Sequence, residues 1–460
     1  MAEASAQRAT DREWGREAGP EVGPEVGRVA GQIVERAAAG SRPADVKTRT
    51  TCRSCGSGRM EAALDLGNHF VSNFADVPDE TRWPRVPLEL MLCGACSLVQ
   101  LRHTTPGEWM YRRYWYKSGV NTSMRAALAD ISQSAAEFAS LESGDSVLDI
   151  GCNDGTLLRS YTLEGIRRVG FEPAENLANE NTQGTDLVVR DFFSARPVAG
   201  EQFQAVTSIA MFYDLEDPNA FVADIAQVLA KGGVWVIEMH YLPLTLERNA
   251  FDAVCHEHLE YYSLESLEPL LERHGLEVAD AETNEVNGGS IRVYVVHRGN
   301  LKAKERAGRE RVEALRDRER ALGLGQLATY RQFCKRVSAI GQRLNEWLAC
   351  ERAQGKEIAV YGASTKGNTL LQVFGIDRSV VRVAAERNPE KWGKYTVGTW
   401  IPIVSEEEAR AHADDFLILP WHFLEEMRER EREFLARGGK LLAPLPEPRV
   451  VDRAGVHRLA

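Results

Sequence analysis

The sequence contains no long apolar run. None of its 460 residues lies in a stretch approaching the roughly 20 continuous apolar residues that a membrane-spanning helix requires. The N-terminus, MAEASAQRATDREWGREAG, lacks the apolar core of a secretory signal peptide. We therefore expect a cytoplasmic protein with no membrane partner.

Positive charge is also in short supply. The chain has 56 Lys and Arg against 67 Asp and Glu, a formal net charge of -11. Proteins that hold a nucleic-acid backbone usually present a basic face, so the balance disfavours nucleic acid as a partner. A hydrophobic fraction of 43% is ordinary for a globular protein. Because 460 residues exceed what one core organises, we expect two to four domains.

Composition divides the chain into five segments. Residues 1–48 are rich in Ala, Gly, Glu, Arg and Pro and predict a mobile extension, and residues 49–120 form a cysteine-framed module. Residues 121–300 alternate helical stretches with short apolar strands, which indicates a doubly wound parallel sheet. Residues 301–354 are charged and helix-favouring, as expected of a connector, and residues 355–451 form a second α/β unit.

Half of the eight cysteines form two C-x-x-C pairs, Cys52 with Cys55 and Cys93 with Cys96. Four thiolates from two such knuckles give a closed tetrahedral zinc site with no position open to water. The alternatives are a redox pair or four unrelated core cysteines. We expect a structural zinc ion, so residues 49–120 are a small N-terminal zinc-binding module.

The segment VLDIGCNDGTLL at 147–158 reads as a buried strand, a glycine-bearing turn and the start of a helix. Its glycines let the backbone approach a ligand, and Glu172, after the next strand, can accept both ribose hydroxyl hydrogens. Asp191 and Phe192 suit an adenine edge. The pattern favours S-adenosylmethionine over a dinucleotide, the alternative being an ordinary tight turn. The predicted cofactor-binding residues are Asp149, Gly151, Asn153, Gly155, Glu172, Asp191 and Phe192.

A second cluster, CHEHLEYYS at 255–263, carries two histidines and two carboxylates just before a predicted helix. Loops at the carboxyl edge of a parallel sheet commonly meet substrate, and histidine is well matched to proton removal near neutral pH. His256, Glu257 and His258 are therefore candidate catalytic residues. A second metal site or structural histidines are the alternatives.

A second glycine-rich turn, GASTKGN at 362–368, again follows a strand and opens a helix. Its backbone N–H groups can cradle phosphates, and Lys366 adds positive charge. Glu386 follows at a spacing suited to a ribose contact. Gly362, Lys366, Asn368 and Glu386 are thus candidate substrate-binding residues, unless this unit binds no ligand.

Several motifs occur together in an order that resembles one family. They are the two zinc knuckles, SGVNTSMR at 118–125, VLDIGCNDGTLL, HEHLEYYS, NGGSIRVYV at 287–295 and YGASTKGNTLL at 361–371. The chain resembles the sugar C-methyltransferases that act on thymidine-diphosphate keto-hexoses, over about residues 50–450. The resemblance implies an α/β protein with a zinc-binding module, a central Rossmann-like class I methyltransferase domain and a C-terminal Rossmann-like domain that helps to hold the sugar nucleotide.

By position in the family's motifs, His258 corresponds to the general base and Glu257 to its acidic neighbour. Tyr116 resembles the tyrosine that reaches the sugar from the N-terminal module. Cys255 stands where better-known members have tyrosine, and Asp214 where they have histidine. Both are expected on the substrate side, so the sugar and the methylated carbon stay open.

We therefore expect an S-adenosylmethionine-dependent C-methyltransferase that acts on a nucleotide-linked, 4-keto deoxysugar through base-catalysed enolate formation. An O- or N-methyltransferase on a sugar nucleotide is the nearest alternative. A nucleic-acid methyltransferase with a zinc ribbon and a non-catalytic sugar-nucleotide binding protein are further ones. The first is opposed by the net acidity of the chain.

Overall fold

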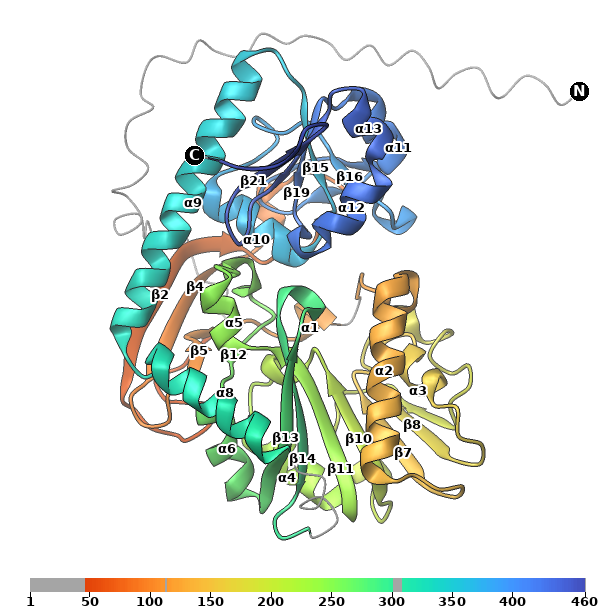
Figure 1. Ribbon diagram of the computed structural model, residues 1–460. Coiled ribbons are helices and arrows are strands. Elements are labelled where there is room, and N and C mark those ends of the chain that lie inside the picture. The colour runs from red at the N-terminus through yellow and green to blue at the C-terminus, as the bar shows by residue number, and fades with distance from the viewer. Residues whose placement is uncertain (1–45, 112–113, 301–307, 460) are drawn as a thin grey trace, which may run out of the picture.

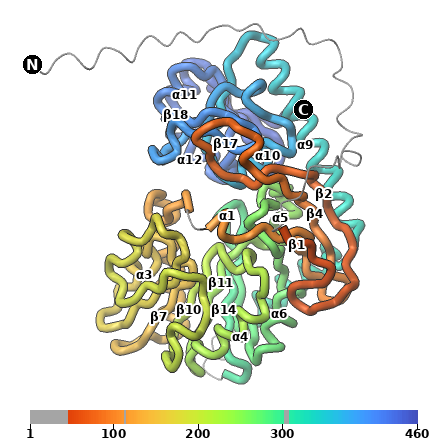
Figure 2. Tube along the Cα trace, turned by 180° about the vertical axis from the view of Figure 1, so that it is seen from behind, coloured from red at the N-terminus to blue at the C-terminus, as the bar shows by residue number. Residues whose placement is uncertain are grey.

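The computed structural model describes residues 46–111, 114–300 and 308–459 and is drawn in Figure 1. The extension predicted over residues 1–48 lies, up to residue 45, outside this part of the chain. The central domain fills the lower half of Figure 1 and the C-terminal domain the upper half. The N-terminal module lies on one flank of both, as the view from behind in Figure 2 also shows.

The N-terminal module is built on a four-stranded antiparallel sheet with the order β12-β5-β4-β2. One of its strands, β12 (Glu260–Tyr261), comes from the segment that contains the predicted histidine cluster. The other elements are β1 (Lys47–Thr48), β2 (Met60–Phe70), β3 (Phe74–Ala75), β4 (Arg85–Cys93), β5 (Val99–Leu101), β6 (His103–Thr104) and α1 (Glu108–Tyr111). The module therefore incorporates a strand from the segment of the predicted histidine cluster.

The central domain contains a seven-stranded sheet with the order β13-β14-β11-β10-β7-β8-β9. Its strands are β7 (Ser146–Ile150), β8 (Arg167–Phe171), β9 (Leu187–Val189), β10 (Phe203–Ile209), β11 (Leu229–His240), β13 (Leu276–Asn284) and β14 (Ser290–His297). Its helices are α2 (Thr122–Ala139), α3 (Thr156–Ser160), α4 (Pro218–Val228), α5 (Leu242–Glu247) and α6 (Leu264–Arg273).

Helices cover both faces of this sheet because successive strand residues point to opposite sides. Val147 packs in one buried cluster with Leu128 of α2, whereas its neighbour Leu148 packs in another with Phe221 of α4 and Leu267 of α6. Both faces are therefore apolar, as a doubly wound sheet requires.

Two helices connect the central domain to the C-terminal domain, α8 (Arg309–Leu322) and α9 (Leu327–Ala353). Helix α9 runs along the flank of the molecule beside β2 and up to the C-terminal domain (Figure 1). Phe333 and Leu344 of α9 belong to the same buried cluster as Leu90 of β4 and Val360 of β15. The N-terminal module, α9 and the C-terminal domain thus share one buried cluster, whereas the central sheet packs in other clusters.

The C-terminal domain contains a second seven-stranded sheet, with the order β18-β16-β15-β19-β20-β21-β22. Its strands are β15 (Ile358–Tyr361), β16 (Ala384–Glu386), β18 (Ile403–Ser405), β19 (Asp415–Ile418), β20 (Lys440–Ala443), β21 (Arg449–Asp452) and β22 (Gly455–Arg458). Its helices are α10 (Thr365–Phe374), α11 (Glu406–His412), α12 (Leu424–Arg430) and α13 (Arg432–Ala436). A short strand, β17 (Tyr395–Thr396), pairs with β3 of the N-terminal module.

The predicted fold class is confirmed: an N-terminal four-cysteine module precedes two Rossmann-like α/β domains. Both large sheets are mixed, however, whereas the sequence predicted a parallel sheet for the central domain. Strand β14 is antiparallel to β11 and β13, and β21 is antiparallel to β20 and β22. The physical reason is connection length, because the few residues between β13 and β14 are too short for the crossover that parallel neighbours need.

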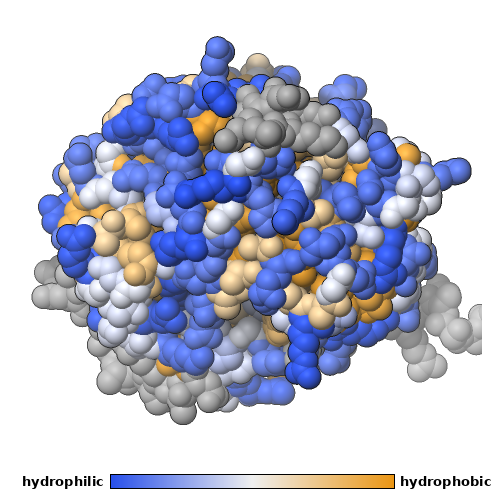
Figure 3. All heavy atoms as spheres, turned by 90° about the horizontal axis from the view of Figure 1, so that it is seen from below, coloured by the Kyte–Doolittle hydropathy of each residue, from blue (hydrophilic) through white to orange (hydrophobic). Residues whose placement is uncertain are grey.

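The lower face of the molecule, seen in Figure 3, is mostly hydrophilic with small, scattered apolar areas. Within the described residues, no helix combines the length and apolar character needed to cross a membrane.

Candidate active site

A cavity of ≈ 440 Å³ lies between the central and C-terminal domains, at the carboxyl ends of the central parallel strands. This is the edge at which open α/β sheets bind ligands. The predicted site residues that line it are Tyr116, Asp149, Gly151, Asn153, Glu172, Asp191, Asp214, Glu257, His258 and Lys366. Those that lie outside its wall are Gly155, Phe192, Cys255, His256, Gly362, Asn368 and Glu386.

The first glycine-rich turn connects β7 to α3 at one end of the cavity. Gly151 and Gly155 have φ of 72° and 79°, and Asn153 has φ of 52°. This left-handed backbone conformation favours glycine and, among other residues, asparagine. The pattern of glycines in the sequence therefore reflects the shape of the turn.

Glu172, directly after β8, stabilises this turn by accepting backbone hydrogen bonds. One carboxylate oxygen accepts a hydrogen bond from the Asn153 N–H and the other from the Ala174 N–H, each at 2.8 Å. Each oxygen keeps a second lone pair, so the carboxylate can still accept ribose hydroxyls. Asp191 lines the cavity nearby, and Phe193, rather than the predicted Phe192, is the aromatic residue beside it on the wall.

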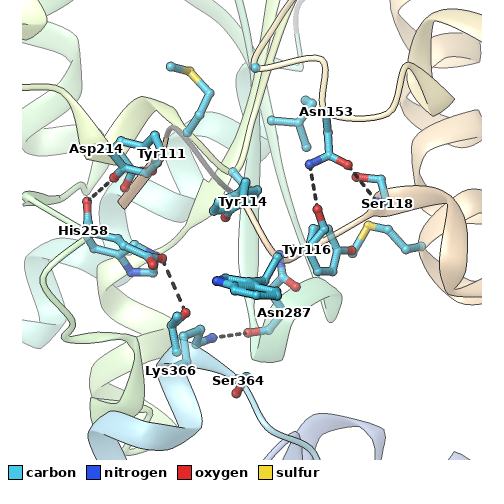
Figure 4. Close-up of a pocket in the computed structure, with 18 of the residues that line it drawn as sticks. Tyr111, Tyr114, Tyr116, Ser118, Asn153, Asp214, His258, Asn287, Ser364 and Lys366 are labelled. Carbon is cyan, nitrogen blue, oxygen red and sulfur yellow. Dashed lines mark hydrogen bonds between the residues drawn. The ribbon is translucent and has the colours of Figure 1, made fainter. Parts of the chain in front are cut away.

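The segment around Tyr116 is tied to the same turn (Figure 4). Asn153 donates from its side-chain amide to the Tyr116 carbonyl at 3.0 Å and accepts from the Ser118 N–H at 2.9 Å. The Gly119 N–H donates to Asp154 at 2.7 Å. These bonds hold Tyr116 at the cavity wall, although its side chain remains 45% exposed.

His258 faces the cavity from the loop between η6 (Phe251–Ala253) and β12 (Figure 4). Its Nδ1 lies 2.7 Å from the Ala253 carbonyl oxygen and therefore donates to it, which leaves the lone pair on Nε2. Burial, with a smaller contribution of the same sign from the Lys366 ammonium group, lowers the pKa of His258 to about 3. The imidazole is thus neutral, with an unprotonated Nε2.

Two carboxyl groups lie on the wall near His258. Burial raises the pKa of Glu257 to about 7, and its Oε2 accepts a 3.5 Å hydrogen bond from Thr365. Burial also raises the pKa of Asp214 well above its usual range, and the charge of Glu257 adds to the effect. Oδ1 of Asp214 is buried with no hydrogen-bond partner among the described residues. A ligand or water commonly satisfies such an atom.

The metal site considered for this loop has a geometric basis, since the ligand atoms of Cys255, Glu257 and His258 lie within 4.8 Å of one another. Cys255, however, lies outside the wall of the cavity, and burial raises the pKa of its thiol well above its usual range.

His256 points away from the cavity. It is 3% exposed, and its Nε2–H donates to the Val86 carbonyl of β4 at 2.9 Å. Burial lowers its pKa to about 4. The contact connects the loop that carries His258 to the N-terminal module.

The second glycine-rich turn is shaped largely by its own domain. Gly362 has φ of 87°, and a Cβ there would lie 2.9 Å from Pro420. The Asn368 side chain donates to the Val397 carbonyl at 2.7 Å and accepts from Thr399 at 2.9 Å. Through these hydrogen bonds the Asn368 side chain stabilises the turn, and it does not line the cavity.

Glu386 occupies a position like that of Glu172. It accepts from the Ala363 N–H and from the Lys391 ammonium group, each at 3.1 Å. Lys366, by contrast, extends into the cavity toward the central domain (Figure 4).

Several residues of the wall were not predicted from the sequence, among them His240, Asp252, Asn287 and His422. His240 ends strand β11, and its place at a carboxyl end of a parallel strand is a signal that could have indicated it. The others lie in short 3-10 helices that meet across the domain boundary: η6, η7 (Val286–Gly288) and η9 (Trp421–Phe423).

The four predicted zinc ligands come together in the N-terminal module. The Sγ atoms of Cys52 and Cys96 are 3.6 Å apart, as are those of Cys55 and Cys93, and all four lie within 4.8 Å. Tetrahedral zinc with Zn–S bonds of about 2.3 Å requires separations near these values. The cluster therefore fits a structural zinc ion.

Comparisons with known proteins agree with this architecture. Three family profiles match successive parts of the chain: a zinc binding domain over residues 52–111, a methyltransferase domain over 120–281 and a C-methyltransferase C-terminal domain over 285–446. C-methyltransferase NovU of Streptomyces niveus is 32% identical over 415 residues, which cover 87% of this chain and 96% of NovU. That similarity extends over all three modules.

Other similarities are shorter. The ubiquinone biosynthesis O-methyltransferase of Bordetella parapertussis is 36% identical over 107 residues, 22% of this chain and 44% of that protein. A crystal structure of an S-adenosylmethionine-dependent methyltransferase from Clostridium acetobutylicum aligns with a TM-score of 0.31 and 12% identity, over 38% of this chain and 92% of that one.

Proposed function

We propose that this chain, which belongs to the zinc-containing, S-adenosylmethionine-dependent C-methyltransferases, methylates a carbon atom next to the ketone of a nucleotide-linked sugar. The observation that carries the proposal is the state of His258. Its Nδ1–H is fixed on the Ala253 carbonyl, and its Nε2 faces the cavity that the cofactor turn also lines. A placed neutral imidazole is what removal of a proton from carbon requires.

The cofactor supplies an electrophilic methyl group when bound. Of the residues proposed to hold it, Glu172 would accept the ribose hydroxyls, and the turn of Gly151 and Asn153 would allow its close approach. Asp191 would accept from the adenine amino group. The buried side chain of Asp149 accepts a hydrogen bond from Thr207 of the neighbouring strand β10 at 2.7 Å, and burial raises its pKa to about 7.

The sugar nucleotide would occupy the rest of the cavity. Asp214 lines its sugar end beside His258, Tyr116 lines the cavity beside the cofactor turn, and the C-terminal glycine-rich turn contributes a further wall. Glu257 keeps the loop closed by its bond to Thr365 of that domain. The free Oδ1 of Asp214 would accept a donor group of the sugar, so it is the residue most suited to select the substrate.

The test is product analysis with a panel of nucleotide-linked 4-keto-sugars and S-adenosylmethionine carrying a ¹³C-methyl group. A C-methyl product, with loss of one deuterium from a substrate labelled next to the ketone, is the expected result. An O-methyl or N-methyl product that retains all the deuterium would contradict the proposal and support the nearest alternative.

A further inference from the structure

Lys366 is the second residue of α10, yet its side-chain contacts lie in the other domain. Its ammonium nitrogen is 3.2 Å from Nε2 of His240, at the end of β11, and 3.4 Å from the carbonyl oxygen of Asn287. Figure 4 shows Lys366 directed toward Asn287 with His258 beside it. The C-terminal domain therefore inserts a positive charge into the base's side of the cavity.

No carboxylate of the described residues lies within salt-bridge distance of this charge, although the charge partly offsets the rise that burial causes in the pKa of Asp252. Within the described ranges, Lys366 forms no salt bridge, and its hydrogen bonds go to a neutral imidazole and a carbonyl. Asp252 is 2% exposed and also lines the cavity, but its Oδ2 accepts from Trp421 at 3.1 Å. The partly buried ammonium group of Lys366 has three N–H donors and uses two of them on neutral acceptors, so one is left for an anion that forms beside it.

The three histidines around Lys366 are neutral. His240, His258 and His422 all line the cavity, and the pKa of each is lowered by burial first and by the Lys366 ammonium second. Nδ1 of His422 and Oδ1 of Asp252 are buried without hydrogen-bond partners in the described part of the chain. These open polar atoms mark the place where a ligand's polar group belongs.

We propose that Lys366 is a catalytic residue whose ammonium group donates to the ketone oxygen of the substrate and stabilises the enolate. The inference rests on the proposed function. It replaces the phosphate contact predicted for Lys366 from the sequence, because both contacts of the side chain lie beside the base rather than around the N-terminus of α10.

The electrons and protons of the step balance. Nε2 of His258 takes the proton, the C–H electron pair becomes the C=C bond, and the carbonyl π pair moves to the oxygen facing Lys366. The enolate carbon then bonds to the methyl carbon of S-adenosylmethionine as the S–CH₃ bond breaks, which leaves S-adenosylhomocysteine and restores the ketone. The His258 imidazolium afterwards releases its proton to solvent.

The decisive measurement is the split between kcat and KM in Lys366→Met. Loss of one enolate donor typically lowers kcat about 10²–10³-fold. We expect such a loss with KM for the sugar nucleotide changed by less than about threefold and with unchanged affinity for S-adenosylhomocysteine. In D₂O, exchange at the reactive carbon should slow in parallel with kcat.

A matched control is Lys391→Met, which removes the other lysine of the cavity wall. The Lys391 ammonium group is already bound to the Ala363 carbonyl at 2.8 Å and to Glu386 at 3.1 Å. The fold-decrease in kcat of Lys391→Met should be at least ten times smaller than the fold-decrease in kcat of Lys366→Met. Ethylammonium added to Lys366→Ala should restore part of kcat, and thermal unfolding reports whether each variant is folded.

A raised KM with kcat near that of the wild type would overturn the inference and return Lys366 to phosphate binding. Absence of ethylammonium rescue in folded Lys366→Ala, together with kcat near wild type in Lys366→Gln, would overturn it as well. The ¹³C-methyl product of the wild-type enzyme separates the two hypotheses. An O-methyl product refutes the proposed function, whereas a C-methyl product with an unaffected Lys366→Met refutes only the role of Lys366.

Discussion

The guanidinium group of Arg53, between two zinc ligands, lies 3.5 Å from the carboxylate of Glu260, just beyond the proposed base. Both side chains are fully buried, with 0% exposure. Arg53 also donates to the Thr104 hydroxyl at 2.6 Å and to the Leu101 carbonyl at 2.5 Å. The zinc module is thereby connected to the loop that carries His258.

Arg53→Met should therefore destabilise the protein strongly, because it leaves the Glu260 carboxylate buried without its partner. Breaking one side of a buried ion pair typically costs about 3–5 kcal/mol. The double variant Arg53→Met with Glu260→Leu should recover much of that loss. Urea midpoints measured for the single and double variants provide the test, and a double variant no more stable than Arg53→Met would refute it.

Purified protein should contain one zinc ion per chain, as measured by metal analysis. Cys52→Ser should lower the Tm by more than about 5 °C, since a loss of 1 kcal/mol shifts Tm by about 2–4 °C in larger domains. The kcat of the folded fraction should change little. Cys350→Ser, at an exposed free cysteine, is the control and should leave the Tm unchanged. Folded, active protein free of zinc would refute the structural role.

Glu172→Ala should weaken binding of S-adenosylhomocysteine by about 1–3 kcal/mol, because the ribose hydroxyls lose their acceptor. Isothermal calorimetry measures this directly. Glu386→Ala is the matched control, since Glu386 holds the same position in the second glycine-rich turn. If Glu386→Ala weakens binding and Glu172→Ala does not, the cofactor belongs to the C-terminal turn.

His258→Asn should lower the rate of methyl transfer at least ~100-fold, as expected for loss of a placed base. Affinity for S-adenosylhomocysteine and the Tm should stay close to those of the wild type. With the keto-sugar and S-adenosylhomocysteine in D₂O, the variant should not incorporate deuterium at the reactive carbon. Exchange that persists in His258→Asn and disappears in His256→Asn would transfer the role of base to His256.

His256 should make the fold sensitive to acid. Its pKa falls from 6.5 to about 4 on burial, so the unfolded chain binds the proton more readily between these values. The stability that neutral His256 contributes is present above pH 6.5 and is lost as the pH falls toward 4. In His256→Gln this loss is absent. Urea midpoints of variant and wild type should therefore converge or cross as the pH falls, and a constant difference would refute the prediction.

The sequence predicted the parts of this protein that depend on local pattern. Each of these patterns spans a short segment of the chain: the zinc cysteines, the glycine-rich turns and the α/β alternation. The structure confirms the architecture that they predicted. The orientation of side chains within the histidine cluster was not accessible in this way. His256 and His258 are equivalent as residue types, but only the packing against β4 turns one toward Val86 and leaves the other at the cavity.

Contacts across the domain boundary were equally hidden. Lys366 and His240 are 126 positions apart in the sequence. No periodicity or spacing in the sequence predicts the contact between their side chains. The two residues of β12 fall within what the sequence presents as a loop, because a strand this short depends on its pairing with β5 rather than on propensity.

The pairing of β12 with β5 also bears on how such enzymes can be recombined. An exchange of the N-terminal module between two relatives, cut at the boundary seen in the sequence, would separate β5 from the strand that completes its sheet. The transplanted sheet would then present an unpaired edge, which invites aggregation. A chimera should carry residues 46–111 together with the segment around Glu260–Tyr261. All four strands of the sheet then come from the same relative, although they are not contiguous in the sequence.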